Sequence, residues 1–521
     1  MFLSKNFGLG YIYGLKVSKM RPQDVQRAKR SVMKVMGVHV GFNWTQPNMT
    51  QEEFQAGGTA FFIDPYDLGE APFFKLNHRY LLTNFHVVDS VQSKTVELCY
   101  PSKGFNRLTA EIIYVVPTLD VAILSIDPNG THVAWRDENI QDFLDSIPNL
   151  KLNTECVKGN SQNVIAIGFP SLSRDVQLCG GKISGRGLGM IQINISLNGG
   201  NSGGPLMHNH KVIGICTASE ADTEAIGLCV PIHQIIRFFK YWASYKSPLM
   251  KLPSWGLHTE ILTEDYLKYH KMKPMKGVLV DKVIPNQACD KAGLSAKDII
   301  LKIKNKNGTY EVDPDGLVKV DWTEKRVHIS NSEFIMSLDP KTIEFEVYKR
   351  KRIVTIPVEP TIITFQTREK FHCWEDIPYV CFGGAIFMDL ALNHMEEDED
   401  EDSCIPADKC YPITNAINEH MNMKSIVVCT HIPGQTYLDT QRSLHPFDII
   451  TKVNNNKVKN VIHFRKLIEK CSNKNKNFVS LETHRNTIYL DLKKIIRQEK
   501  KLVSKLDNQV FLLSKKRKRL R

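Results

Sequence analysis

Short runs of apolar residues, separated by turn-forming residues, dominate the first half of the chain. Runs of four to eight residues bounded by glycine, proline, asparagine or aspartate predict β-strands, and many in succession predict a sandwich or a pair of barrels. The clearest runs are Thr59–Ile63, Tyr80–Thr83, Ala110–Val116, Val121–Ile126 and Val164–Pro170. An amphipathic helix is predicted from Pro231 to Tyr245, because proline is tolerated in the first turn of a helix.

A second pattern occurs twice in the remaining chain. Its first copy contains Gly277–Val280, Val283–Pro285 and Lys297–Ile303, and its second contains Ser425–Val428, His431–Gly434 and Pro446–Ile450. This degenerate repeat predicts two related α+β modules. The acidic run Glu396–Asp402 repels itself and predicts a disordered loop inside the second module.

Length and cysteine usage add two limits. A chain of 521 residues is long enough for about three domains, and no run of 18 apolar residues exists, so no membrane-spanning helix is expected. The 12 cysteines show no C-x-x-C pair, which is typical of reduced thiols in an intracellular protein. Cys404 and Cys410 bracket a loop without a histidine at ligand spacing, so we predict no metal site.

The net charge of +12 is concentrated at the end of the chain. Lys493–Arg521 contains twelve lysines and arginines against Glu499 and Asp507, which gives +10. Its run Lys515–Arg519 fits a nuclear-localisation signal, a nucleic-acid contact or a solvated tail. The first 36 residues carry eight basic residues and one acid, as an organellar presequence or a basic lead helix would. A nuclear or cytoplasmic location is favoured, with an organelle as the alternative.

A serine flanked by glycines, Gly200-Asn201-Ser202-Gly203-Gly204, carries the strongest chemical signal. Glycines permit a tight loop whose N–H groups converge on one point, as an oxyanion hole requires. We therefore predict Ser202 as a nucleophile, with Gly200, Asn201 and Ser202 as oxyanion donors. An isolated motif of this kind is equally compatible with a glycine-rich surface turn.

A base and an acid lie upstream of the serine. His86 follows an apolar run, and Asp120 opens another. A serine nucleophile needs a base, and the base needs a carboxylate to fix its tautomer. The order His, Asp, Ser, with spacings of 34 and 82 residues, is that of the chymotrypsin-like double barrel, whereas α/β-hydrolases and subtilisins use other orders.

The three motifs together resemble the HtrA/Deg family of serine proteases. The matching segments are Thr83-Asn84-x-His86-Val87-Val88, Asp120-x-Ala122-x-Leu124 and Gly200–Leu206. The resemblance implies a mostly β protein. Its expected parts are a basic N-terminal extension (1–36), a trypsin-like double β-barrel (37–247), a first PDZ domain (248–362), an atypical second PDZ domain with the acidic loop (363–495) and a basic tail (496–521). The second PDZ domain is similar to that of plant-type Deg proteases.

The resemblance also implies a function. The chain is expected to be an ATP-independent endopeptidase that cleaves unfolded or damaged proteins without a metal or organic cofactor, as a trimer or multiple of trimers. Peptide C-termini are expected to bind the first PDZ domain at a turn formed by Gly277, Val278, Leu279 and Val280. The second PDZ domain lacks this glycine and carries the extra element Tyr379–Phe387, which could fill its groove, so assembly is its expected role.

Two alternatives and one departure remain. The chain could be a catalytically idle PDZ scaffold or a chaperone, associated with nucleic acid through its basic tail. An intact His/Asp/Ser set argues against an idle scaffold, since only catalysis requires all three. The loop Gly185–Gly189 is shorter than is usual in the family, which leaves the switching of the site open.

Overall fold

The computed structural model describes residues 21–503 with gaps, in two compact units. The gaps are residues 50, 70–73, 101–106, 130–138, 158, 171–172, 188, 220–225, 244–246, 307, 324, 363–368, 396–424 and 474–476. One unit contains residues 1–38, 55–281 and 296–360, and the other contains 39–54, 282–295 and 361–521. The predicted acidic run and Lys515–Arg519, like Cys404, Cys410 and most of the N-terminal extension, lie outside the described residues.

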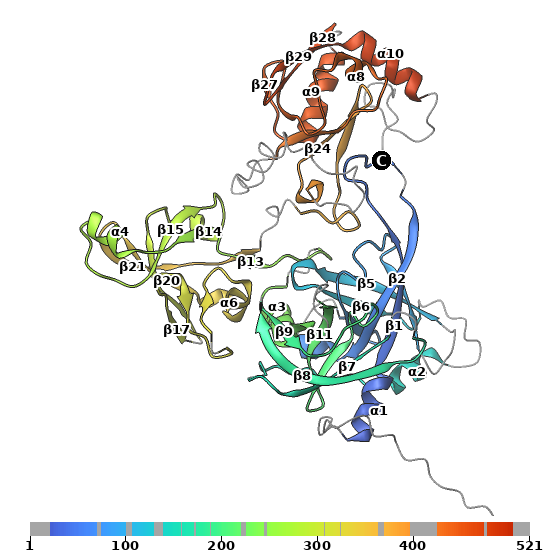
Figure 1. Ribbon diagram of the computed structural model, residues 1–521, viewed down its shortest axis with the longest axis vertical. Coiled ribbons are helices and arrows are strands. Elements are labelled where there is room, and N and C mark those ends of the chain that lie inside the picture. Colours follow the sequence, from blue (N-terminus) through green and yellow to red (C-terminus); the bar gives the residue numbers. More distant parts are fainter. Residues whose placement is uncertain are drawn as a thin grey trace, which may run out of the picture. The chain divides into compact units, whose positions relative to one another are not determined.

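The first barrel closes from six strands in the order β1-β2-β3-β6-β5-β4 (Figure 1). These are β1 (Val32–Val40), β2 (Glu53–Ile63), β3 (Arg79–Thr83), β4 (Thr95–Cys99), β5 (Arg107–Val116) and β6 (Val121–Ile126). All six residues of β6 are buried, and five of them are apolar. Helix α1 (Pro22–Arg30) precedes β1, so the barrel begins five residues before the predicted boundary at residue 37.

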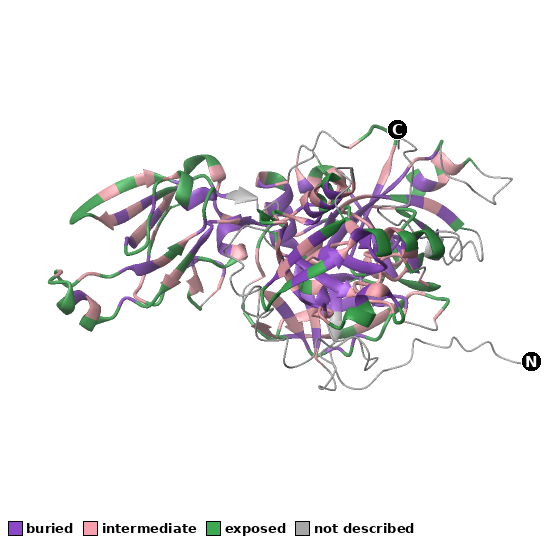
Figure 2. Cartoon of the chain, turned by 90° about the horizontal axis from the view of Figure 1, so that it is seen from above, coloured by how far each residue is buried: buried purple, intermediate pink, exposed green. Residues whose placement is uncertain are grey.

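The second barrel has the order β10-β11-β12-β9-β8-β7. Its strands are β7 (Asn163–Gly168), β8 (Gln177–Gly187), β9 (Met190–Ile193), β10 (Pro205–His208), β11 (Lys211–Ser219) and β12 (Gly227–Pro231). Figure 2 shows the buried residues concentrated inside the barrels. Helix α3 (Ile232–Tyr241) follows and ends earlier than predicted, where the N–H of Trp242 bonds to Phe238 O. Shorter helical segments are η1 (Pro65–Leu68), η3 (Pro117–Leu119) and α2 (Ile140–Ser146).

The middle module is a PDZ-like sheet in the order β14-β15-β16-β20-β21. Its elements are β13 (Pro253–Ser254), β14 (Leu257–Glu260), α4 (Glu264–Tyr269), β15 (Val278–Val283), α5 (Ala288–Lys291), β16 (Ile299–Asn305), β17 (Gly308–Glu311), β18 (Leu317–Val318), β19 (Val327–His328), α6 (Ser332–Ser337), η4 (Pro340–Thr342), β20 (Glu344–Lys349), β21 (Arg352–Pro357) and β22 (Thr361–Ile362).

This strand order bears on the predicted peptide site of the middle module. Gly277 precedes β15, which contains Val278, Leu279 and Val280 and lies between β14 and β16. Val278 pairs with Ile300, and the N–H of Val280 donates to Asp298 O. A peptide adds only to a strand with an unpaired edge. In this order β15 is interior, and the two edge strands are β14 and β21.

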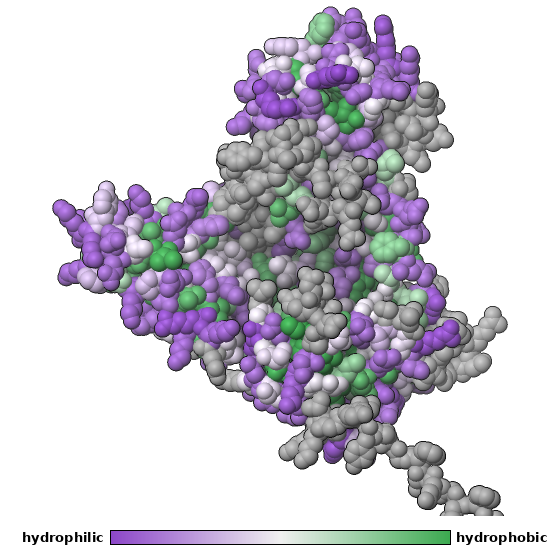
Figure 3. Space-filling model, in the orientation of Figure 1, coloured by the Kyte–Doolittle hydropathy of each residue, from purple (hydrophilic) through white to green (hydrophobic). Residues whose placement is uncertain are grey.

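The C-terminal module is a second sheet, in the order β23-β24-β25-β26-β28-β29. Its elements are β23 (Tyr379–Phe382), β24 (Ala385–Asp389), η5 (Leu392–His394), β25 (Val427–His431), α8 (Tyr437–Gln441), β26 (Ile449–Val453), β27 (Asn456–Lys457), α9 (Val461–Asn473), β28 (Phe478–Thr483), β29 (Thr487–Asp491) and α10 (Leu492–Val503). Hydrophilic residues cover most of its described surface in Figure 3, while apolar side chains such as Phe387 and Phe464 pack inside with ring centroids 4.8 Å apart.

The segment between β1 and β2 packs on the C-terminal module. Phe42 and Trp44 contact the cluster formed by Cys381, Ile386 and Met388. Two hydrogen bonds fix the backbone of this segment: His372 Nε2 lies 3.0 Å from Val40 O, and Thr430 Oγ1 donates to Thr45 O at 2.8 Å. Residues 39–54 therefore belong to the second compact unit, although they connect two barrel strands.

Candidate active site

Strand pairing in the first barrel brings His86 and Asp120 together. Thr83, the last residue of β3, pairs with Ala122 of β6, so the segments that leave these strands are neighbours. Asp120 ends η3 in the left-handed conformation, with φ 49°. Its carboxylate accepts hydrogen bonds from His86 N at 3.0 Å and from His86 Nδ1 at 2.9 Å. Because Nδ1 carries the proton, Nε2 is left as the acceptor that a general base needs.

The electrostatics of this pair act on the imidazole. Burial is the largest effect and lowers the pKa of His86, but the hydrogen bond and charge of Asp120, with the charge of Asp89, together raise it above its ordinary value. Asp89 is another acid near His86 in the sequence, and its carboxylate accepts hydrogen bonds from the backbone N–H and the hydroxyl of Ser90. The imidazole of His86 is hydrogen-bonded to Asp120 and not to Asp89 in the described structure.

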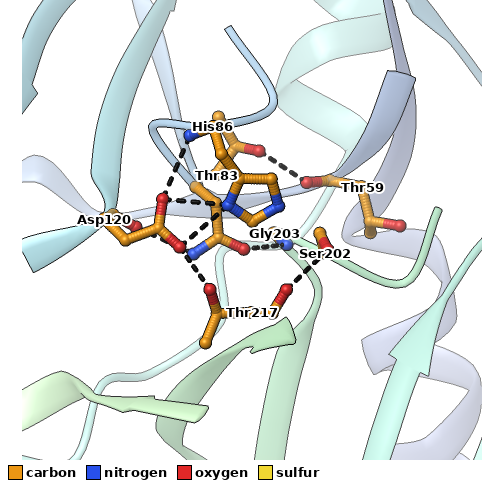
Figure 4. Close-up of polar contacts among 8 residues, drawn as sticks. Thr59, Thr83, His86, Asp120, Ser202, Gly203 and Thr217 are labelled. Atoms are coloured by element: carbon orange, nitrogen blue, oxygen red, sulfur yellow. Dashed lines mark hydrogen bonds and ion pairs between the residues drawn. The ribbon is translucent and has the colours of Figure 1, made fainter. Parts of the chain in front are cut away.

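Ser202 lies in the loop of residues 198–204 between β9 and β10, which we call the nucleophile loop. Its Oγ donates to Thr217 O at 2.8 Å and makes no hydrogen bond to His86 in the described structure. The hydroxyl of Thr217 donates to the Asp120 carboxylate, so Thr217 contacts both the serine and the acid (Figure 4). Because a hydroxyl has one proton, the Ser202 O–H must turn away from Thr217 O before it can give that proton to the imidazole.

Two of the three predicted oxyanion donors are available. Within the described residues, the N–H groups of Gly200 and Ser202 donate to no other group. The N–H of Asn201 instead donates to Asn198 O at 3.1 Å, so it cannot serve as the third donor. Gly203 has φ 86°, and a Cβ there would lie 2.0 Å from Thr59 O, so the loop requires glycine at this position.

The structure adds three residues that sequence reasoning did not assign. Thr217 follows the apolar run of β11, Thr59 lies in β2, and Asn84 lies inside the motif that contains His86. Asn84 was part of the quoted motif, but its spacing from the other segments gave no indication of a contact. All three are buried polar side chains, with at most 8% of their surface exposed.

Strands β8 and β9 are antiparallel neighbours, and Gly187 pairs with Met190. Strand β8 extends to Gly187 and β9 begins at Met190. The carbonyl of Gly189 accepts a hydrogen bond from Gln234 Nε2 of α3 at 2.9 Å. The side chain of Gln234 thus connects helix α3 to the segment Gly185–Gly189, which the sequence analysis described as shorter than is usual in the family.

Comparisons with known proteins agree with this geometry. Residues 58–215 match the trypsin-like peptidase domain family, and residues 370–507 match the PDZ domain family. An Arabidopsis thaliana protein named as the mitochondrial Do-like protease 12 is 26% identical over 479 residues, which span 88% of this chain and 82% of the relative. Protease Do-like 4, mitochondrial, of the same plant is 24% identical over 471 residues, or 86% of this chain and 78% of the relative.

A bacterial relative covers less of the chain. Serine protease Do-like HtrA of Bacillus subtilis is 31% identical over 254 residues, which span 44% of this chain and 51% of that protein. Among the described residues, no helix is long and apolar enough to cross a membrane.

Proposed function

Because the chain is a member of the HtrA/Deg family of serine proteases, we propose that it cleaves peptide bonds with Ser202 as the nucleophile, His86 as the base and Asp120 as the orienting acid. The observation that supports this best is the 2.9 Å hydrogen bond between His86 Nδ1 and Asp120, which leaves His86 Nε2 open as the acceptor for the serine proton. The predicted mostly β fold, the HtrA/Deg resemblance and the endopeptidase class are confirmed.

The proposed reaction has two halves. Ser202 Oγ attacks the carbonyl carbon of the substrate and gives its proton to His86 Nε2. The oxyanion accepts hydrogen bonds from the N–H groups of Gly200 and Ser202. When the C–N bond breaks, His86 returns the proton to the leaving amine, and water then hydrolyses the acyl-enzyme by the same route. Fixed donors at the oxyanion are worth about 10²- to 10³-fold each in kcat.

The proposed substrates are unfolded or damaged proteins, cleaved without ATP. We propose that peptide C-termini bind the middle module along β14, because this strand is an edge of its sheet and lies beside β15, which follows the predicted turn. Thr259 of β14 lies 3.3 Å from His328 Nε2, so a polar pair lies beside the proposed strand-addition site. Main-chain hydrogen bonds along an edge strand supply affinity, and neighbouring side chains supply selectivity.

The C-terminal module is proposed to serve assembly into a homo-oligomer, a trimer or a multiple of trimers. Strand β23 forms a hairpin with β24 through Gly383 and Gly384, so β24 has neighbours on both sides. The N–H of Gly383 donates to the buried carboxylate of Glu499 at 2.8 Å. Strand β23 therefore occupies the edge of β24 that an added peptide strand would pair with. The Glu499 carboxylate accepts a backbone N–H that a peptide carboxylate could otherwise bind.

Deleting residues 363–521 tests this division of roles. The oligomer mass in light scattering is expected to change, because the module proposed for assembly is lost. Binding of a labelled C-terminal peptide, measured by fluorescence polarisation, is expected to be retained, because β14 is intact. A truncated protein with the original mass and no peptide binding would reverse the two assignments.

Location and other partners are proposed more broadly. The two Arabidopsis relatives named above carry mitochondrial labels, which supports an organelle as the location and gives no support to the predicted nucleus or cytoplasm. The comparisons likewise lend no support to the scaffold, chaperone or nucleic-acid alternatives, and the basic run of the tail lies outside the described residues. We retain proteolysis as the single proposed function.

Labelling with a fluorophosphonate tests the proposal directly. The purified full-length chain should form a covalent adduct, and mass spectrometry should map it to the peptide that contains Ser202. Heat-denatured protein is the control, because only a folded site activates the hydroxyl. An adduct on another serine, or no adduct with active reagent, would refute the assignment.

A further inference from the structure

We infer that Thr59 and Asn84, two side chains of the first barrel, position the nucleophile loop of the second barrel for catalysis. The inference rests on the proposed roles of Ser202, His86 and Asp120. Neither side chain contacts the reacting atoms, so both are positioning residues. Figure 4 labels Thr59 together with Ser202 and Gly203 of this loop.

Thr59 holds the nucleophile loop at two carbonyl groups. Its backbone N–H donates to Ser202 O at 2.8 Å, and its hydroxyl donates to Gly200 O at 2.7 Å. The N–H of Phe169 donates to the same hydroxyl oxygen at 3.0 Å. Because a hydroxyl has one proton and Phe169 occupies an acceptor site on its oxygen, that proton is directed at Gly200 O. Thr59 is fully buried, so water does not compete for these bonds.

The Gly200 carbonyl matters because its peptide plane lies between the two proposed oxyanion donors. Gly200 has φ 92° and no side chain, so steric restrictions alone leave its backbone unusually free. The bond from Thr59 restricts rotation of the Gly200–Asn201 peptide. Without it, the orientation of the Gly200 and Ser202 N–H groups relative to each other would be less restricted.

Asn84 connects the acid to the residue after the nucleophile. Its Nδ2 donates to the carbonyl of Asp120 at 2.8 Å, and its Oδ1 accepts from the N–H of Gly203 at 2.5 Å. The side-chain amide of Asn84 is fully buried. Its NH₂ group faces a carbonyl acceptor and its oxygen faces an N–H donor, so both ends of the amide are satisfied. One rigid side chain thus joins the His86–Asp120 segment to the Ser202 segment across 119 residues of sequence.

A simpler interpretation is that both side chains only stabilise the fold. A buried hydrogen bond of that kind would affect the melting temperature and leave the chemical step unchanged. A positioning role makes a different prediction: kcat falls while KM changes little, because the loop is misaligned for the transition state. Transition-state analogues that use the oxyanion site should weaken in parallel.

The test uses the full-length chain with Thr59→Val, which removes the hydroxyl and keeps the shape, and Thr59→Ser, which restores the hydroxyl. Ser125→Ala is the matched control, because it removes a buried hydroxyl of the same barrel that is bonded to His78 at 3.0 Å. We expect Thr59→Val to lower kcat on a fluorogenic peptide by about 10- to 100-fold, somewhat less than loss of a direct donor. Affinity for a peptide aldehyde should fall by the same factor.

The controls separate the possible outcomes. Thr59→Ser should recover most of kcat, and Ser125→Ala should lower the melting temperature without changing kcat. Asn84→Ala should lower kcat by at least about tenfold, within the range for misaligned catalytic groups. Wild-type kcat in a folded Thr59→Val protein would overturn the inference, even if Asn84→Ala failed to fold. A wild-type chain that does not react with fluorophosphonate would overturn the proposed function and the inference with it.

Discussion

Ser202→Ala is expected to abolish casein cleavage and to leave the thermal unfolding midpoint nearly unchanged. The proposed reaction has no other nucleophile, and loss of the serine in a comparable triad costs on the order of 10⁶ in kcat. The hydroxyl is half-buried and makes one hydrogen bond, to Thr217 O, so its removal changes little packing. Casein hydrolysis and differential scanning fluorimetry of the two proteins measure both effects.

A suitable control for Ser202→Ala is an exposed serine of the same domain. Ser93 is exposed and hydrogen-bonded only to Thr95 nearby, so Ser93→Ala should retain full activity. Residual casein cleavage by Ser202→Ala within tenfold of wild type would rule out Ser202 as the nucleophile. A large fall in the melting temperature would instead indicate that the nucleophile loop depends on this hydroxyl.

Asp120→Asn is expected to lower kcat by about 10⁴-fold, because an amide at this position favours the wrong imidazole tautomer. The carboxylate accepts from His86 N, His86 Nδ1 and Thr217 Oγ1, and an asparagine cannot accept all three. The variant should also change the pH profile. In wild type, activity is lost as the pH falls through the pKa of His86, which lies above the ordinary value of about 6.5.

Without the carboxylate, burial remains as the main influence on His86, and burial lowers its pKa. The acid limb of the pH profile of kcat/KM should therefore move to lower pH in Asp120→Asn. The profile is measured on a fluorogenic peptide between about pH 5 and 9, close to the range in which proteins are usually most stable. Asp89→Asn is the control and should have a small effect, because Asp89 acts on His86 by charge alone. A loss of only a few-fold in Asp120→Asn would mean that another acid orients the imidazole.

Sequence reasoning reached the barrels and the three catalytic candidates because each rests on a local pattern. The apolar runs Tyr80–Thr83 and Val121–Ile126 became β3 and β6, and their pairing brings His86 to Asp120. Order along the chain then selected the double barrel over other serine hydrolases. These features need no knowledge of which distant strands are neighbours.

Other features depend on that knowledge and were missed. The bond from Thr59 to Gly200 spans 141 residues, and the bond from Asn84 to Gly203 spans 119, so neither leaves a periodic signal. The peptide site was predicted at the turn Gly277–Val280 from the resemblance to PDZ domains. The edge position of β14 was not predicted, because this strand has four residues and one buried position, a pattern too short to recognise.

The contact between residues 39–54 and the C-terminal module has a consequence for biosynthesis. Thr45 and its partner Thr430 are separated by 385 residues, and Val40 and His372 by 332. The ribosome adds about 5–20 residues per second, so it needs roughly 20 to 80 s to reach Thr430 after it has added Thr45. During that interval Phe42 and Trp44 have no apolar surface of the C-terminal module to cover them. The nascent chain should therefore be most prone to aggregation, and most in need of a chaperone, after its first barrel has emerged and before Thr430 has been added.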